Sequence, residues 1–344
     1  MPEAVAFETP LSGREADFAI GGGGDAVQTI VPESDLPRYE GIAFSTTGDR
    51  IAIATSEGNA VLLYRRDADG RFEDAPCARF GNPGARLDYP HDAAFARVRG
   101  RELMAVANRS GTVCIWDKHP DDVDFPRDPA FEIGGPEAEL DYSDGVAFVP
   151  PRNDRLAVCN LFGRSITFYR LASHAPLAFR LKPEFTLKHE SLREPDGLAF
   201  SACGRWLATA NHGDDSVSIY QRRNRLLSGN RLRYGPKPVA ILRDSSLRYP
   251  HSVAFAPRTN SLVVTNAGAN YINVYAKRPG RFRHEWASEP VARHIVGDED
   301  VFREINASNK MEGGPKGIAI HGDRLAICSP EFGVKIYPLV DRAA

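Results

Sequence analysis

Short apolar segments alternate with polar turns along most of the chain, and the pattern recurs six times. The clearest copy runs from Tyr249 to Phe255, and five related segments share its central alanine within an apolar run. Aligning the alanines at positions 43, 94, 147, 199, 254 and 319 gives spacings of 51, 53, 52, 55 and 65 residues. A repeat of roughly 40–50 residues or slightly more is typical of the blades of a β-propeller.

Each repeat contains apolar segments of strand length. An inner segment around Ala-Phe is followed by a polar turn and by a segment of small and β-branched residues, such as Trp206 to Ala210, which suits a strand packed on both faces. The third segment alternates in character and ends on an aromatic residue, as in Val217 to Tyr220. A fourth, outer strand follows, for example Phe131 to Ile133 and Val239 to Leu242. The pattern predicts an all-β fold with four antiparallel strands per blade.

The sixth repeat lacks a fourth strand, because it stops near Tyr337. A short apolar segment, Val27 to Val31, precedes the first repeat and has no partner nearby in the sequence. We expect this N-terminal strand to close the last blade, since ring closure protects sheet edges that otherwise aggregate. The sequence therefore predicts a six-bladed β-propeller over residues 25–340, preceded by a tail and glycine linker at residues 1–24.

The motifs that open the repeats resemble those of known six-bladed propellers. Residues 195–200 (Pro-Asp-Gly-Leu-Ala-Phe) and 314–320 (Gly-Pro-Lys-Gly-Ile-Ala-Ile) resemble the start of NHL-type repeats. Glu40-Gly41, Ser143-Asp144-Gly145 and Pro195-Asp196-Gly197 resemble motifs of the wider group that includes the SMP-30/gluconolactonase family. The resemblance covers nearly the whole chain and implies the same fold, whereas one fold can host many activities.

One position in every repeat carries an ionisable residue, three residues before the anchor alanine. In a propeller the innermost strand of each blade lines the central channel, so this position lies where that strand begins. Blades three apart face each other, so we expect His91 to face His251, Glu40 to face Asp196 and Asp144 to face Lys316. The six ring residues are Glu40, His91, Asp144, Asp196, His251 and Lys316.

The ring residues have the chemistry of a metal or catalytic site. Two neutral imidazoles with carboxylates can hold Zn²⁺, Fe²⁺ or Mn²⁺, whereas carboxylates with Asn carbonyls suit Ca²⁺. The alternative is that these polar side chains only satisfy backbone N–H groups at the strand starts. The candidate catalytic residues are His91, His251, Asp196 and Lys316, and the candidate metal ligands are Glu40, His91, Asp144, Asp196 and His251.

The family resemblance implies roles for part of this ring. It implies a divalent-metal shell of Glu40, Asp144 and Asp196, with Asp196 also a candidate general base. The chain departs from that family by having Asp144 where Asn is usual, and by placing two histidines and a lysine in the ring. With histidines in its channel, the chain resembles instead the lyases built on related folds. In those enzymes a metal or a His/Glu pair abstracts a proton beside a carbonyl.

Two further groups of residues adjoin the ring. Asparagines end the second strand in four repeats, where they can act as further ligands or simply form the hairpin turns. Aromatic residues precede several ring positions, where they can wall a pocket or pack between blades. The candidate rim residues are Asn108, Asn160, Asn211, Asn266, Tyr89 and Tyr249.

The last connection is about ten residues longer than the others, and its extra residues fall in 297–312. Val301, Phe302 and Ile305 are spaced like one face of a short helix. The insertion runs directly into Lys316, so it must lie near the channel mouth. It is either a lid over the site or a surface elaboration.

Composition narrows the range of partners. Lys and Arg number 43 against 45 Asp and Glu, without a basic patch, so a nucleic-acid partner is not expected. Since apolar runs fall short of the ~18 residues of a membrane span and the N-terminus lacks a signal-peptide pattern, we expect no membrane partner. The five cysteines are scattered, and Cys114, Cys159 and Cys328 sit inside apolar runs, which favours a reduced, cytoplasmic setting.

Two functional hypotheses follow from these observations. The first is an enzyme, a metal-assisted hydrolase of lactonase type or a lyase, that acts on a small-molecule ligand at the channel mouth. Its cofactor would be a divalent metal, with Ca, Zn, Fe and Mn all possible. The second is a non-catalytic propeller that binds a ligand or another protein with its rim.

Overall fold

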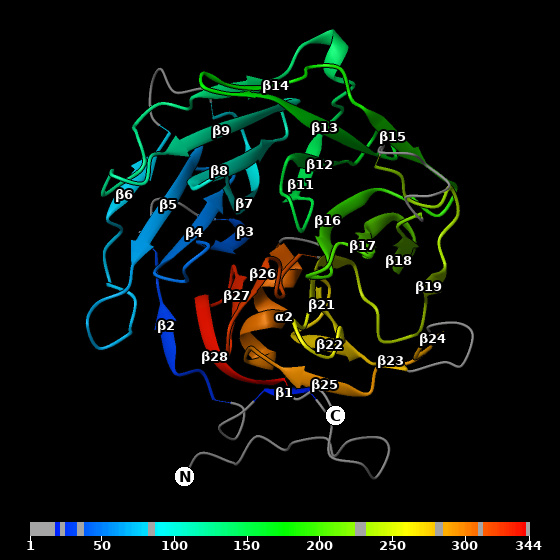
Figure 1. Ribbon diagram of the computed structural model, residues 1–344. Coiled ribbons are helices and arrows are strands. Elements are labelled where there is room, and N and C mark those ends of the chain that lie inside the picture. The colour runs from blue at the N-terminus through cyan, green and yellow to red at the C-terminus, as the bar shows by residue number, and fades with distance from the viewer. Residues whose placement is uncertain are drawn as a thin grey trace.

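The computed structural model describes residues 18–20, 25–32, 38–81, 87–223, 232–278, 285–308 and 312–341. These residues form six large sheets arranged around a central axis, and one further two-stranded sheet (Figure 1). Each large sheet is one blade of four antiparallel strands running outward from the axis, and consecutive innermost strands are neighbours all the way round the ring. The predicted six-bladed β-propeller is therefore confirmed.

Blades I to III follow one another in sequence, and the first strand of each lies at the axis. Blade I contains β3 (Tyr39–Phe44), β4 (Arg50–Thr55), β5 (Ala60–Arg65) and β6 (Ala78–Phe80). Blade II contains β7 (Pro90–Val98), β8 (Arg101–Asn108), β9 (Thr112–Lys118) and β10 (Phe131–Ile133). Blade III contains β11 (Ser143–Phe148), β12 (Arg155–Asn160), β13 (Ser165–His174) and β15 (Phe185–Lys188), and β14 (Leu177–Phe179) pairs with the far end of β13.

Blades IV to VI complete the ring. Blade IV contains β16 (Pro195–Phe200), β17 (Trp206–Asn211), β18 (Ser216–Gln221) and β19 (Ala240–Leu242). Blade V contains β20 (Pro250–Phe255), β21 (Leu262–Asn266), β22 (Tyr271–Tyr275) and β25 (Ala292–Ile295), with a small hairpin of β23 (Lys277–Arg278) and β24 (Glu285–Trp286). Blade VI contains β26 (Ile318–His321), β27 (Arg324–Ser329), β28 (Gly333–Asp341) and β2 (Gln28–Ile30).

The N-terminal strand closes blade VI. β2 pairs antiparallel with β28, with Gln28 opposite Ile336 and Ile30 opposite Val334. A further strand, β1 (Phe18–Ile20), pairs with the end of β28, so the pairing extends into residues that the sequence pattern assigned to the tail. The two ends of the chain are thus joined in one sheet, as the missing fourth strand predicted.

The apolar core is divided between the blades. The described residues contain six buried apolar clusters, and each of them spans two neighbouring blades. The cluster between blades VI and I includes Ile30 together with Ile53, Leu62 and Ile336. Because every blade is buried on both faces, its second strand reads as a nearly continuous apolar run. Cys114, Cys159 and Cys328 are buried as expected, and none of the five cysteines forms a disulfide.

The insertion before blade VI forms helix α2 (Glu299–Ser308), as its spacing predicted. Figure 1 shows α2 between blades V and VI, close to the axis. Phe302 and Ile305 are only half-buried, so the helix is not part of the core. Residues 309–311 of this insertion lie outside the described residues.

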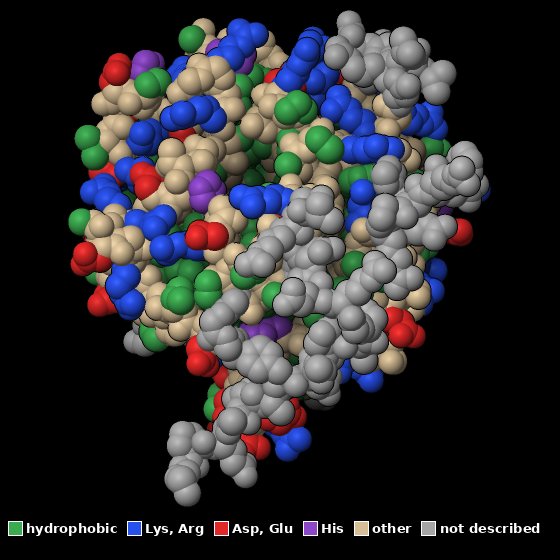
Figure 2. All heavy atoms as spheres, turned by 60° about the horizontal axis from the view of Figure 1, so that its bottom comes forward, with side chains coloured by type: hydrophobic (Ala, Val, Ile, Leu, Met, Phe, Trp, Pro, Cys, Tyr) green, Lys and Arg blue, Asp and Glu red, His purple; other side chains and the backbone are tan. Residues whose placement is uncertain are grey.

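The surface mixes charges in keeping with the balanced composition. On the face shown in Figure 2, Lys and Arg side chains lie among neutral and acidic ones. Among the described helices, none is long and apolar enough to cross a membrane.

Closure by β2 predicts an asymmetric effect of two neighbouring substitutions. Ile30 is 1% exposed in the cluster between blades VI and I, whereas Val31 is 75% exposed. Ile30→Ala should reduce the free energy of unfolding by about 2–4 kcal/mol, because it leaves a cavity at the closure. Val31→Ala should change it by less than about 0.5 kcal/mol. Urea denaturation of the two variants measures both values, and equal effects would contradict closure by β2.

Candidate functional site

The ring residues face the axis because the inner strands are irregular where they begin. In blades I to V the ring residue is the second residue of the innermost strand, and the pairing register shifts at that point. Such β-bulges bend a strand and re-aim a side chain. The residue just before each of these five strands also has a positive φ; the five are Arg38, Tyr89, Tyr142, Glu194 and Tyr249.

Glycines next to the ring residues let the inner strands approach closely. A Cβ atom on Gly41 would lie 2.6 Å from the Asp92 Cα atom, and one on Gly145 would lie 2.4 Å from the Asp196 carbonyl oxygen. Gly197 and Gly317 meet the next blade in the same way. The recurring glycine after a ring residue is therefore required by packing around a narrow axis. This packing brings all six ring side chains into one cluster.

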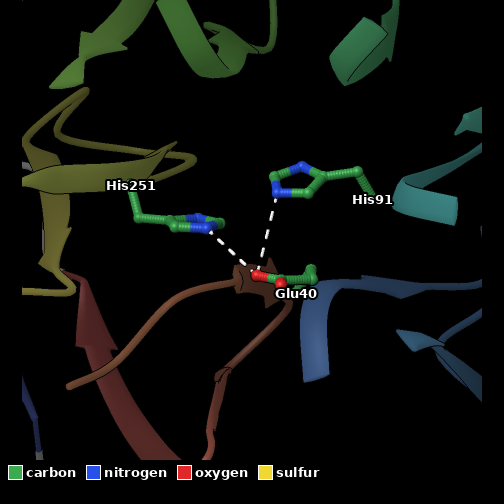
Figure 3. A group of neighbouring side chains, drawn as sticks. All are labelled: Glu40, His91 and His251. Atoms are coloured by element: carbon green, nitrogen blue, oxygen red, sulfur yellow. Dashed lines mark ion pairs between the residues drawn. The ribbon is translucent and has the colours of Figure 1, made fainter. Parts of the chain in front are cut away.

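All six ring residues are buried and lie within contact of one another or of shared partners. Each is at most 2% exposed. The imidazoles of His91 and His251 stack with their ring centroids 5.1 Å apart, as their positions half a turn apart predicted. Both point toward Glu40, whose Oε2 atom lies 3.7 Å from His91 Nε2 and 3.3 Å from His251 Nε2 (Figure 3).

Lys316 is held by carboxylates. Its Nζ atom lies 2.7 Å from Glu40 Oε2 and 2.8 Å from Glu312 Oε2. Burial disfavours the Glu40 carboxylate, but Lys316 and the two histidines hold the pKa of Glu40 well below its ordinary value. Among the described residues Asp144 pairs with Arg109 rather than with the expected Lys316, at 2.6 Å from its Nε atom. Lys316 is therefore an ion-paired cation at the site.

Burial keeps several of the acidic and imidazole groups in their neutral forms more readily than in water. Burial and the neighbouring Asp196 raise the pKa of Asp144 to about 8. Burial raises the pKa of Asp196 to about 6, although His251 opposes the shift. Burial, followed by Arg109, holds the pKa of His91 well below its ordinary value. Two carboxylates that share a dry site resist simultaneous ionisation, so this part of the cluster favours an added positive charge.

His212 is a member of the site that the sequence pattern did not reveal. It lies in a short 3-10 turn, His212–Asp214, directly after β17, and its Nε2 atom is 3.0 Å from Asp196 Oδ2. Its ring stacks on Tyr249 at 4.0 Å between centroids. Burial lowers the pKa of His212 to about 4, although Asp144 opposes the shift. The imidazole is therefore neutral near pH 7 and has a lone pair for a metal.

The asparagines that end the second strand of four blades do not face the axis. Asn108, Asn160, Asn211 and Asn266 are fully buried, and the Oδ1 atom of each accepts a backbone N–H from the loop that leads into its own blade. Their NH₂ groups donate to residues across the hairpin. These contacts favour the turn-forming role over a ligand role.

The residue that follows the second strand supplies the second layer of polar contacts. Arg109, after Asn108, contacts both Asp144 and His91, and its Nη2 atom lies 2.8 Å from His91 Nε2. Ser56, after Thr55, donates to Glu40 at 3.2 Å. Since side chains alternate along a strand, the residue after the asparagine faces the axis when the asparagine faces the loop. That alternation was the signal in the sequence for Arg109 and His212.

The aromatic residues before the ring positions differ in their contacts with the site. Tyr249 is half-buried against His212, so it forms part of the wall of the site. Tyr89 is 37% exposed, and the structure gives it no contact with the ring residues among the parts of the chain described. Tyr142 packs under Arg109, whose guanidinium carbon lies 5.0 Å from the ring centroid.

Three overlapping groups of side chains have ligand atoms close enough together to hold a metal ion. They are Glu40 with His91 and His251, Asp196 with His212 and His251, and His91 with Asp144 and Asp196. The carboxylate set Glu40, Asp144 and Asp196 that the family resemblance implied is not one of these groups among the described residues. Histidine nitrogens in every group favour Zn²⁺, Fe²⁺ or Mn²⁺ over Ca²⁺, which takes six to eight oxygen ligands.

The ligand atoms of the second group face one another without a hydrogen bond of good geometry, and His251 Nε2 also lies 3.3 Å from Glu40 Oε2. Asp196 Oδ2, His212 Nε2 and His251 Nε2 are all buried, and none makes a hydrogen bond of good geometry with any residue that the structure describes. Asp196 Oδ2 lies 3.0 Å from His212 Nε2 and 3.7 Å from His251 Nε2. Ligands of a tetrahedral zinc lie about 3.4 Å apart, given bonds of 2.0–2.2 Å. In the other groups, Arg109 or Lys316 already occupies a ligand atom.

The Lys316–Glu40 pair predicts a large, non-additive effect on stability. Lys316→Met leaves the fully buried Glu40 carboxylate without its closest cation, so unfolding should become easier by about 3–5 kcal/mol. Adding Glu40→Gln removes the unpaired charge, and the double variant should be at least about 1 kcal/mol more stable than the sum of the two single changes. Chemical denaturation of the four proteins measures this coupling. Additive losses would show that the pair is not coupled.

Comparison with known proteins shows a similarity in fold and none in sequence to a known family. No protein-family model matches the sequence, and no curated protein matches it either.

Three of the matching solved structures share little sequence with the chain. The β-propeller domain of Cps50 (Swd1) from Myceliophteria thermophila has a TM-score of 0.52 at 12% identity, covering 87% of this chain and 96% of its own. A candidate 6-phosphogluconolactonase from Bacteroides uniformis has a TM-score of 0.58 at 15% identity, covering 88% and 81%. A functionally unknown protein from Desulfotomaculum acetoxidans has a TM-score of 0.54 at 9% identity, covering 87% and 85%. The chain is thus a β-propeller like these proteins in architecture.

Proposed function

We propose that this protein is a metal-dependent enzyme, a hydrolase or a lyase, that acts on a small molecule at the mouth of the central channel. The observation that carries the proposal is the convergence of Asp196 Oδ2, His212 Nε2 and His251 Nε2, all buried and without a hydrogen-bond partner among the described residues. Leaving buried polar atoms unpaired costs roughly 1–3 kcal/mol each, so a fold retains such a group mainly where a ligand satisfies it.

The donor set suits a transition metal with open coordination positions. Two imidazoles and one carboxylate are the ligands of catalytic zinc and of non-haem iron sites. When bound there, the metal would polarise a carbonyl oxygen or lower the pKa of a bound water. Both hydrolysis of an ester or lactone and removal of a proton beside a carbonyl use this chemistry, so the ligand set fits either arm of the proposal.

The remaining ring residues have complementary roles in this proposal. His91 is neutral, stacks against His251 and has its Nδ1 atom 3.6 Å from Asp144, so it can exchange a proton with a group bound beside the metal. Arg109 fixes the imidazole of His91 through its Nε2 atom and neutralises Asp144. Lys316 keeps Glu40 ionised and contributes positive charge rather than acting as a base.

The non-catalytic alternative also has an observation in its favour. The ring residues are sealed from solvent and most of them are ion-paired, which a purely structural plug of the channel would also show. In that case the protein would bind partners with its rim. The enzyme is favoured by the buried ligand atoms that make no hydrogen bond of good geometry, because a structural plug gains nothing from such atoms.

Metal content tests the proposal, with two histidine variants as a matched pair. The purified protein should contain about one equivalent of zinc, iron or manganese by elemental analysis. His212→Asn should lose most of the metal, because it removes a ligand of the proposed group alone. His91→Asn should retain it, because His91 belongs only to the other two groups.

The opposite results discriminate clearly. Loss of metal in His91→Asn but not in His212→Asn would place the metal in another group and overturn the assignment. A wild-type protein that stays metal-free after dialysis against each of the three metals would favour the structural plug. Thermal melting of both variants checks that the propeller is still folded.

A further inference from the structure

The Glu312 side chain lies at the channel mouth, where it contacts two cationic residues from other parts of the chain. Glu312 is the last residue of the insertion that contains α2, and its side chain turns inward to the ring. One oxygen, Oε2, lies 2.7 Å from Arg38 Nη2 and 2.8 Å from Lys316 Nζ. The side chain is 18% exposed, Lys316 is fully buried and Arg38 is 26% exposed, so the contact lies at the boundary between the buried cluster and solvent.

The contact is strongly electrostatic. Burial opposes ionisation of Glu312, but Lys316 and further positive groups lower its pKa to about 2. His251 also lowers the pKa of Glu312, and Glu312 raises the pKa of His212. The carboxylate is therefore within electrostatic reach of two proposed metal ligands, while it contacts the two cations directly.

Without Glu312, the two cations would share too few negative partners. Arg38 Nε lies 3.2 Å from Glu40 Oε1, and Lys316 Nζ lies 2.7 Å from Glu40 Oε2. Glu57 also approaches Arg38, at 3.6 Å, but its side chain is 42% exposed. One buried carboxylate thus faces two cations, and charge-assisted hydrogen bonds from arginine and lysine are the usual means of binding carboxylates and phosphates.

We propose that Arg38 and Lys316 form the binding pocket for the carboxylate or phosphate group of an anionic substrate, and that Glu312 fills this pocket until the substrate displaces it. The proposal rests on the proposed function in one respect, that the molecule bound here is the one that reaches the metal. It adds the substrate class, an anionic small molecule. It also makes Glu312 an internal competitor, with its carboxylate in the place of the substrate's.

Anion binding by defined variants tests this pocket. Inorganic phosphate and acetate are titrated separately into wild-type protein and Glu312→Ala, with calorimetric detection. Removal of the competitor should tighten binding of at least one of these anions by about tenfold or more. Phosphate alone would indicate a phosphorylated substrate, and acetate alone or both anions a carboxylate-bearing one. Glu57→Ala is the matched control, since it removes a carboxylate near Arg38 without opening the pocket, and it should bind both anions as the wild type does.

A second substitution shows whether the gain comes from the pocket. Adding Arg38→Met to Glu312→Ala should abolish the gain. If Glu312→Ala does not fold, Glu312→Gln removes the charge while keeping the volume, and it should still bind one of the anions more tightly than wild type. An unchanged affinity for both anions in the folded variant, an equal gain in Glu57→Ala, or a gain that survives Arg38→Met would each overturn the proposal.

The same titrations in a His212→Asn background separate this inference from the metal site. The gain caused by Glu312→Ala should persist there, because Arg38 and Lys316 are not metal ligands. A gain that requires His212 would mean that the anion binds the metal, which overturns the pocket and leaves the proposed function intact. If the wild-type protein binds none of the three metals and Glu312→Ala still gains anion affinity, the pocket is supported and the proposed metal site is contradicted.

Discussion

The close approach of six inner strands at one axis is the constraint on which this structure depends. Glycines at positions 41, 145, 197 and 317 permit that approach, because any side chain there would overlap the backbone of the next blade. With so little room at the axis, whatever each blade places at the start of its inner strand must meet its counterparts. Apolar clusters between the blades hold the arrangement together, and β2 completes it by joining the ends of the chain.

Bringing ionisable side chains together away from water is costly unless they satisfy one another. The structure meets most of this cost with specific pairs, Lys316 with Glu40 and Arg109 with Asp144. The facing atoms of Asp196, His212 and His251 lack hydrogen-bond partners among the described residues, as does the second carboxylate oxygen of Asp144, Oδ2. The same cluster thus contains a balanced part, which keeps its geometry, and an unbalanced part, which has the chemistry of a ligand site. This division is typical of functional sites, where local stability is exchanged for reactivity.

The fold could be predicted from the sequence because each blade of a propeller is a local repeat with its own periodic pattern of apolar residues. Strand order, blade number and closure by residues 28–30 all follow from alternation, spacing and one missing strand. The ring was predictable for the same reason, since position in the repeat determines position around the axis, and the stacking of His91 on His251 follows from blade count alone.

The rest of the site follows less directly from the repeat. Arg109 and His212 come directly after the asparagine of their blades, where alternation turns a side chain to the axis, but the same position holds Leu161 and Ala267 in other blades, so it does not mark a functional residue by itself. Glu312 belongs to an insertion without a counterpart in the other blades, so its contact with Arg38 across 274 residues of sequence had no pattern to predict it. The family resemblance favoured a carboxylate shell, whereas the geometry favours one carboxylate with two histidines.

The central claim is that Asp196, His212 and His251 together hold a transition metal. Anomalous X-ray diffraction from crystals of the purified protein, recorded on both sides of the zinc, iron and manganese absorption edges, locates such a metal directly. The account predicts one strong peak within about 2.0–2.3 Å of Asp196 Oδ2, His212 Nε2 and His251 Nε2. A peak bonded instead to His91, or crystals that have been soaked in each metal and show no peak in the ring, would contradict it.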